Sequence, residues 1–134
     1  SKVVDTMAET IELTSKNDGM VLGLALNYGS RGEIVDAVQA IAEECKEGRI
    51  SPDQVNEQCI SDHLYTGGWK DPDLLIRTSG ELRVSNFLLW QISYAEFYVT
   101  ETYWPDFDTE ATDEAIRDFA QRSRRMGDVK AADV

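Results

Sequence analysis

Apolar side chains recur every three or four residues in several parts of the chain, which places them on one face of a helix. The spacing predicts amphipathic helices over residues 3–15 and 34–45, and Gly48 is a suitable stop for the second. A last helix is expected to run to Gly127. Its inward-facing positions are expected to be Ala111, Ala115, Ile116, Phe119 and Ala120.

Nearly unbroken apolar runs predict strands that are buried on both faces of a parallel sheet. The clearest run covers residues 20–26, and shorter ones cover residues 74–76 and 97–100. Residues 27–32 follow the first run as a polar, glycine-rich loop. Residues 86–94 are expected to form a short helix.

The segment from Ser51 to Gln54 has the form of a helix start. Ser51 is a suitable N-cap, Pro52 fits the first turn, and Gln54 can complete a capping box. We expect this third helix to end near Tyr65.

The order of helices and strands predicts an α/β fold, with a partial parallel sheet flanked by helices on both faces. Only three strands are predicted, whereas about five or six are typical of a sheet. We therefore expect residues 1–127 to be the carboxy-terminal portion of a larger domain. Residues 128–134 are expected to be an acidic, disordered tail.

The composition argues against several kinds of partner and site. The 134-residue chain has a net charge of −12, whereas binding of nucleic acid needs a basic face. No apolar run is long enough to cross a membrane. Cys45 and Cys59 are interpreted as buried free thiols, because their spacing suits neither a disulfide framework nor a zinc site.

An arginine-rich turn follows the second predicted strand. Arg77 ends that strand, and Glu81, Arg83 and Ser85 follow on the turn. Arginine offers a planar fork of donors that matches phosphate, and open α/β sheets bind ligands at the carboxyl ends of their strands. Together with a second arginine cluster at residues 117–125, the turn favours a small, highly charged anionic ligand. The same arginines could instead be surface residues paired with nearby carboxylates.

Three blocks of sequence carry a resemblance to a known family. They are Leu26-Asn27-Tyr28-Gly29-Ser30-Arg31 with Glu33-Ile34, residues 71–91 with Tyr94-Ala95-Glu96, and Trp104-Pro105-Asp106-Phe107. The last block is also expected to form a rigid aromatic corner. On these blocks the chain resembles cis-prenyltransferases of the undecaprenyl diphosphate synthase and dehydrodolichyl diphosphate synthase type. The resemblance implies the fold of that family. It also implies a transferase that condenses isopentenyl diphosphate with an allylic diphosphate, such as farnesyl diphosphate, to give a polyprenyl diphosphate with the help of Mg²⁺.

The resemblance also implies roles for individual residues. Arg77, Arg83 and Ser85 match residues that hold the diphosphate of isopentenyl diphosphate. Glu81 matches the acidic, catalytic member that orients this site. Glu96 matches a glutamate implicated in magnesium binding or its surroundings.

Two further elements concern subunit contacts and the first loop. Arg125 and Gly127 match an Arg-x-Gly element that completes the diphosphate site of a neighbouring subunit, so a homodimer or a heteromer with a related subunit is implied. Basic residues followed by glycine are also a usual way to end a helix.

Asn27 either lines the substrate site or stabilises its loop. A cytoplasmic location with peripheral membrane contact through the lipid product is expected.

The chain departs from the family in two places. Ser30 stands where many members have a second glycine, and the family's first strand, with the aspartate and loop that hold the allylic diphosphate and magnesium, has no counterpart. We therefore expect the chain to carry the isopentenyl-diphosphate-binding half and to be inactive alone. A non-catalytic partner subunit of a heteromeric enzyme is one alternative, and a phosphate-sensing α/β module of another family is a second.

Overall fold

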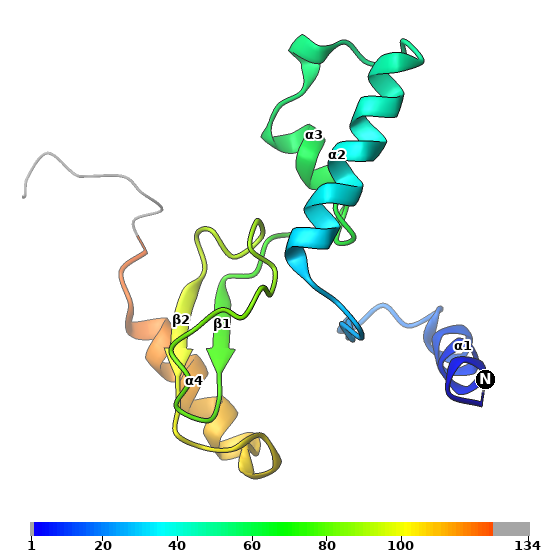
Figure 1. The fold of residues 1–134 in the computed structure, drawn as a ribbon. Coiled ribbons are helices and arrows are strands. Elements are labelled where there is room, and N and C mark those ends of the chain that lie inside the picture. The colour runs from blue at the N-terminus through cyan, green and yellow to red at the C-terminus, as the bar shows by residue number, and fades with distance from the viewer. Residues whose placement is uncertain (1, 125–134) are drawn as a thin grey trace, which may run out of the picture.

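The computed structural model of the chain describes residues 2–124 (Figure 1). Helices make up most of its regular structure, and one small sheet lies in the second half of the chain. The elements in chain order are α1 (Lys2–Thr14), α2 (Ser30–Lys46), the 3₁₀ turn η1 (Pro52–Gln54), α3 (Glu57–His63), β1 (Leu74–Arg77), β2 (Glu96–Val99), the 3₁₀ turn η2 (Trp104–Asp106) and α4 (Thr109–Gln121).

The sheet consists of two parallel strands, β1 and β2. Helix α4 packs against β2 and runs alongside the sheet, whereas α2 and α3 pack against each other (Figure 1). The predicted α/β class with a parallel sheet is confirmed. Between residues 2 and 124, however, the sheet holds two of the three predicted strands, and its face away from α4 carries a cavity in place of a flanking helix.

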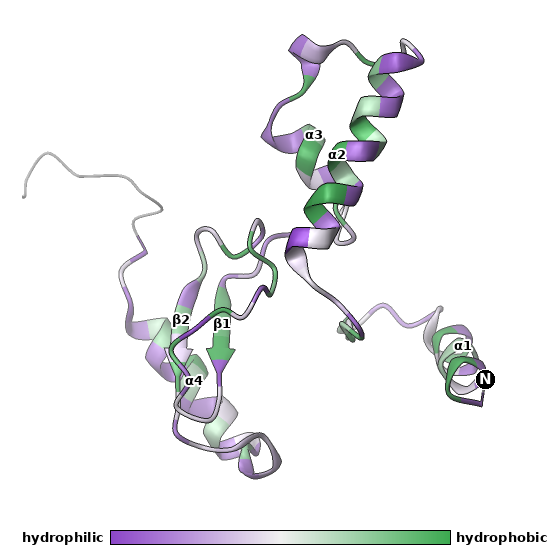
Figure 2. Ribbon diagram, in the orientation of Figure 1, coloured by the Kyte–Doolittle hydropathy of each residue, from purple (hydrophilic) through white to green (hydrophobic). Residues whose placement is uncertain are grey.

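The two faces of the sheet have different surroundings. Leu75 and Arg77 share a face with their register partners Phe97 and Val99, and all four line one cavity. Successive side chains of a strand point to opposite faces. Glu96 therefore lies on the other face, where α4 packs. Figure 2 shows that β1 is strongly apolar, so most of this strand contributes packing and only its last residue contributes charge.

Residues 20–26 form an extended, exposed segment, so the prediction of a strand was wrong. Leu22 keeps 74% of its surface exposed. A strand needs a neighbour to pair with its backbone N–H and C=O groups, and in the described residues β1 and β2 pair with each other. The Trp69 ring lies close to this segment, since an added Cβ at Gly23 would be 3.0 Å from it.

Residues 86–94 form a series of turns, so the prediction of a short helix was also wrong. Ser85, Asn86 and Leu88 have φ angles of 55°, 61° and 47°. Such left-handed conformations cost about 1–3 kcal/mol each for residues with a side chain. They also interrupt a right-handed helix, whatever the apolar spacing.

The third predicted helix is divided into two pieces. The capping box at Ser51 forms as predicted, with both of its hydrogen bonds to Gln54. It begins only the single turn η1, because Val55 returns to an extended conformation. Asn56 then caps α3 by accepting a hydrogen bond from the Cys59 N–H at 2.9 Å.

The remaining predicted helices are present, with shifted ends. Helix α2 begins at Ser30, earlier than predicted, and Gly48 with a φ of 72° follows its end. Helix α4 ends at Gln121, because Arg122 is extended, so the predicted end at Gly127 was wrong. The inward prediction was also wrong for Ile116, which is 51% exposed, and for Ala120, which is exposed too.

The buried apolar core of the described residues is small and consists of Ala37, Ile41, Leu64, Ile92 and Ala115. The predicted aromatic corner is confirmed by the stacked rings of Trp104 and Phe107, whose centroids lie 6.0 Å apart.

Both cysteines are free and half-buried. None of the helices between residues 2 and 124 is long and apolar enough to cross a membrane.

Candidate anion-binding site

Three charged side chains meet at the carboxyl end of β1. Arg77 closes the strand, and Glu81 and Arg83 lie on the segment that follows. The Arg77 Nη2 lies 3.2 Å from the Glu81 Oε2, and the Arg83 Nη2 contacts the same oxygen. One carboxylate oxygen thus joins two guanidiniums.

Two backbone N–H groups of the turn already have acceptors inside the protein. The Ser79 N–H donates to the Thr102 carbonyl at 2.9 Å, and the Gly80 N–H donates to the Thr100 carbonyl at 2.8 Å. Gly80 has a φ of 66°, a backbone conformation that favours glycine, and an added Cβ there would meet the end of the Glu101 side chain. These two N–H groups are therefore not available to an anion, whereas the guanidiniums of Arg77 and Arg83 border the cavity.

The guanidiniums border a cavity with a volume of about 280 Å³. The charged part of its lining comes from Arg77, Glu81 and Arg83. A charged rim beside an apolar wall suits a ligand with an anionic head and a short hydrocarbon portion. The apolar wall is made by Leu75, Leu82, Val84, Phe97 and Val99.

Arg77 is the less exposed of the two arginines, with 35% of its side chain exposed against 66% for Arg83. The Arg77 Nε is buried and has no hydrogen-bond partner among the described residues. A buried donor without a partner costs about 1–3 kcal/mol. Two guanidiniums and one carboxylate also leave the cluster with a net positive charge. A small anion would supply both an acceptor and the missing negative charge.

The other substrate-binding candidates lie apart from this cavity or outside the described residues. Ser85 is exposed two residues beyond Arg83, and it is not part of the cavity lining. Asn27 lines a different hollow and has a φ of 51°. Arg125 and Gly127 lie outside the described residues. The roles of all four in substrate binding stay predictions.

Glu96 pairs with Arg122 and does not reach the cavity. Its Oε2 accepts a hydrogen bond from the Arg122 Nη1 at 3.0 Å, and the Asp118 Oδ2 accepts one from the Arg122 Nε at 2.8 Å. These hydrogen bonds, that from Glu96 first, raise the pKa of Arg122 above its ordinary value. Glu96 therefore stabilises a cation in the described structure.

A magnesium site needs several oxygen ligands, usually including one or two carboxylates. Between residues 2 and 124, no group of three acidic, histidine or cysteine side chains could hold a metal ion. Glu96, with Arg122 beside it, offers one carboxylate. The described residues do not by themselves fit a magnesium ion, and the role of Glu96 as a metal ligand stays a prediction.

Other arginines near the end of α4 also pair with carboxylates. The Arg117 Nη2 lies 3.7 Å from the Asp113 Oδ2, and the Arg124 Nη1 lies 2.5 Å from the Asp73 Oδ1. The second pair ties the segment after α4 to the residue before β1. The described arginines of this cluster thus pair with carboxylates of the protein, and binding of an anionic ligand by the cluster stays a prediction.

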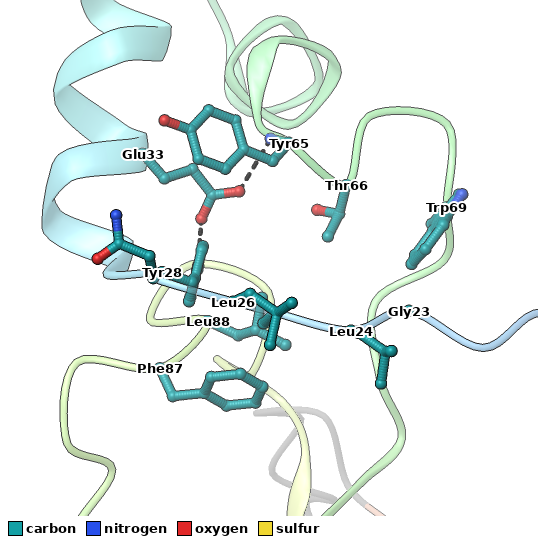
Figure 3. A pocket seen from close by; sticks show the side chains of 12 residues that line it. Gly23, Leu24, Leu26, Tyr28, Glu33, Tyr65, Thr66, Trp69, Phe87 and Leu88 are labelled. Carbon is teal, nitrogen blue, oxygen red and sulfur yellow. Dashed lines mark hydrogen bonds between the residues drawn. The ribbon is translucent and has the colours of Figure 1, made fainter. Parts of the chain in front are cut away.

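A buried carboxylate forms a second polar centre, at a residue that belongs to the first of the three sequence blocks. Glu33, in the first turn of α2, is fully buried. It accepts hydrogen bonds from the Tyr28 hydroxyl and from the Tyr65 N–H at 2.9 Å (Figure 3). It also accepts one from the Gln91 Nε2 at 3.2 Å. Burial and the hydrogen bond to Glu33 raise the pKa of the Tyr28 hydroxyl.

The sequence holds a signal for this burial. Glu33 stands four residues before Ala37 and eight before Ile41, so all three share one face of α2, and the two apolar residues are buried. Glu33 lines an apolar hollow of about 310 Å³ (Figure 3). Tyr28 and the exposed segment of residues 23–27 line the same hollow. A charged residue on an apolar helix face indicates a buried polar network.

Comparison with known proteins identifies similar sequences over almost the whole chain. A family model described as "Putative undecaprenyl diphosphate synthase" matches residues 1–127. The isoprenyl transferase of Streptococcus thermophilus is 50% identical over 132 residues, which are 96% of this chain and 53% of that protein. The isoprenyl transferase of Bacillus cereus is 53% identical over 123 residues, which are 92% of this chain and 48% of that protein. The chain spans about half the length of these curated relatives.

A solved structure has the same fold. Lavandulyl diphosphate synthase from Lavandula x intermedia, in complex with dimethylallyl diphosphate, superposes with a TM-score of 0.88 and 39% sequence identity. The match covers 92% of this chain and 53% of that protein.

Proposed function

The chain belongs to the undecaprenyl diphosphate synthase family, and on this premise we propose that its arginine site binds the diphosphate of isopentenyl diphosphate. Within the whole enzyme, this diphosphate would belong to the substrate that is condensed with an allylic diphosphate to give a polyprenyl diphosphate. The apolar wall beside the arginines would contact the isopentenyl group.

One observation carries the proposal. Two guanidiniums, from Arg77 and Arg83, converge at the carboxyl end of β1, and the Arg77 Nε is a buried donor without a partner among the described residues. A diphosphate has several acceptor oxygens and at least two negative charges, so it satisfies donors that one carboxylate cannot. Arginine pairs with phosphate through two parallel hydrogen bonds, which also fixes the orientation of the ligand.

Glu81 is proposed to orient the two arginines. Its oxygen contacts both guanidiniums and keeps them together when no diphosphate is bound. With substrate bound, Arg77 and Arg83 would neutralise the diphosphate and hold the homoallylic double bond in one place. Catalysis by such a site consists mainly of placement and charge neutralisation.

The rest of the reaction is also part of the proposal. Because the chain spans about half the length of its relatives, we propose that the allylic diphosphate is held by residues outside it and that the chain alone has no synthase activity. We propose that the whole enzyme uses Mg²⁺, because the family resemblance implies it, and Glu96 is the candidate ligand. Arg125 and Gly127 are proposed to complete the site of a neighbouring subunit in a dimer, and contact with a membrane would come through the lipid product.

The test is a calorimetric titration of the chain with isopentenyl diphosphate. Arg77→Ala and Arg83→Ala should each weaken binding at least about tenfold, because a charge-assisted hydrogen-bonded pair contributes about 1.5–3 kcal/mol. Arg117→Ala is the matched control: this arginine is 73% exposed on α4, and its loss should leave the affinity unchanged.

The alternative, a non-catalytic partner subunit, makes a different prediction. Such a subunit has no need for a diphosphate site, so the unmodified chain and both arginine variants would bind isopentenyl diphosphate equally weakly. That result would overturn the proposed role of the arginines.

A further inference from the structure

Helix α2 depends on a distant loop for its N-terminal cap. Its N-cap residue, Gly29, has no side chain, so the first N–H groups of the helix need acceptors from elsewhere. Asn86 supplies two of them. The Ser30 N–H donates to the Asn86 carbonyl at 2.9 Å, and the Arg31 N–H donates to the Asn86 Oδ1 at 2.9 Å. Because Gly29 has no side chain, it also leaves room for the Asn86 side chain: an added Cβ would lie 2.8 Å from the Asn86 Nδ2.

The helix in turn holds the loop of residues 85–91. Ser30 is fully buried, and its Oγ accepts a hydrogen bond from the Leu89 N–H at 2.9 Å. One turn further on, Glu33 accepts the hydrogen bond from Gln91. The loop is therefore attached to the first turn of α2 through Asn86, Leu89 and Gln91.

These attachments explain why the loop keeps backbone angles that are unfavourable for residues with side chains. Ser85 and Asn86 both have positive φ angles. Residues with side chains keep such angles only where the surrounding structure determines them, and here the contacts with α2 do so. Arg83 lies on the same segment, three residues before Asn86 and at the edge of the cavity. The direction in which the chain leaves Arg83 and Ser85 is thus set by α2.

We propose that Asn86 and Ser30 are positioning residues, which place Arg83 and Ser85 for the diphosphate by capping α2 and holding the loop. The inference rests on the proposed function, because it names the residues that set the geometry of that same site. Ser30 contributes through its hydroxyl, which a glycine at this position cannot do.

The test compares two substitutions of one residue. Asn86→Gly keeps a positive φ without strain but removes the Oδ1 acceptor, whereas Asn86→Asp keeps an oxygen acceptor at the helix N-terminus. Affinity for isopentenyl diphosphate is measured calorimetrically at a temperature at which every variant is folded. Asn86→Gly should weaken binding roughly three- to tenfold, and Asn86→Asp should stay within about twofold of the unmodified chain. Ser30→Ala should resemble Asn86→Gly, because the Leu89 N–H loses its acceptor.

Ile41→Val is the control that distinguishes a general loss of stability from the loss of the loop contacts. This substitution removes buried volume from α2 without touching the loop, so it should lower the melting temperature and leave the affinity unchanged. Equal affinity of Asn86→Gly and the unmodified chain would overturn the inference. So would an Ile41→Val affinity that falls as far as that of Asn86→Gly.

Amide hydrogen exchange separates this inference from the proposed function. If the unmodified chain does not bind isopentenyl diphosphate, the proposed function fails, and exchange at residues 83–89 still decides the positioning role. Faster exchange there in Asn86→Gly, with rates restored in Asn86→Asp, supports the role. Unchanged exchange in Asn86→Gly overturns it.

Discussion

Arg77 and Glu96 lie on opposite faces of the same two-stranded sheet. Arg77 is in register with Val99 and lines the cavity, whereas Glu96 begins β2 and pairs with Arg122 beside α4. Strand alternation, not distance along the chain, separates them. The sheet thus presents the cavity bordered by Arg77 on one face and the ion pair beside α4 on the other.

Replacement of Arg77 by lysine should weaken binding of isopentenyl diphosphate by about tenfold, or about 1.4 kcal/mol. Lysine keeps the charge but loses the planar fork that makes two parallel hydrogen bonds with phosphate. The affinity is measured by calorimetry, with Arg117→Lys as the control. An affinity equal to that of the unmodified chain would show that charge alone is recognised.

The ion pair between Glu96 and Arg122 should contribute at most about 1 kcal/mol to stability, because both side chains are partly exposed. A double-mutant cycle with Glu96→Gln and Arg122→Met, followed by urea unfolding, measures this coupling free energy. Asp118 keeps a partner for Arg122 in the first single variant. A coupling of zero would mean that the pair does not stabilise the contact between the sheet and α4.

Glu33→Gln should lower the free energy of unfolding by about 1–3 kcal/mol, because an amide replaces one acceptor oxygen with a donor in a fully buried site. Tyr28, Tyr65 and Gln91 all donate to this carboxylate, so at least one of them would lose its acceptor. Urea unfolding measures the effect. Glu43→Gln, on the exposed side of the same helix, is the control and should change stability by less than about 0.5 kcal/mol.

The raised pKa of Tyr28 predicts a loss of stability in alkaline solution. Burial and the hydrogen bond to Glu33 favour the neutral hydroxyl in the folded state. This contribution is fully present below pH 10.0, the ordinary pKa of tyrosine, and is lost as the pH rises through the higher folded-state pKa.

Tyr28→Phe checks this linkage, since phenylalanine cannot ionise. Unfolding free energies are compared at about pH 9 and about pH 11, on either side of the tyrosine pKa. The variant should lose less stability between these two values than the unmodified chain does. Part of the decline should remain, because the pKa values of Tyr65 and Tyr98 are raised as well. An identical decline in both proteins would contradict the prediction.

Much of the candidate site could be predicted from local sequence. Arg77, Glu81 and Arg83 lie within seven residues of one another around a tight turn, so their proximity follows from chain connectivity and the glycine at position 80. Glu96 could not be placed in this way. Its surroundings depend on which face of β2 meets α4, and that is a matter of packing between distant elements.

The sequence by itself determined the amphipathic helices, the two paired strands and the arginine turn, because periodicity, capping residues and turn residues act over a few neighbours. Only the tertiary structure decided that the apolar run at residues 20–26 stays unpaired, since a strand requires a partner that its own residues cannot supply. It also decided that the loop after the site takes left-handed angles and caps α2, because Asn86 meets Arg31 across fifty-five residues of chain. Hydrogen bonds between such distant segments leave no local pattern in the sequence, so only the folded chain shows that this loop contacts the first turn of α2.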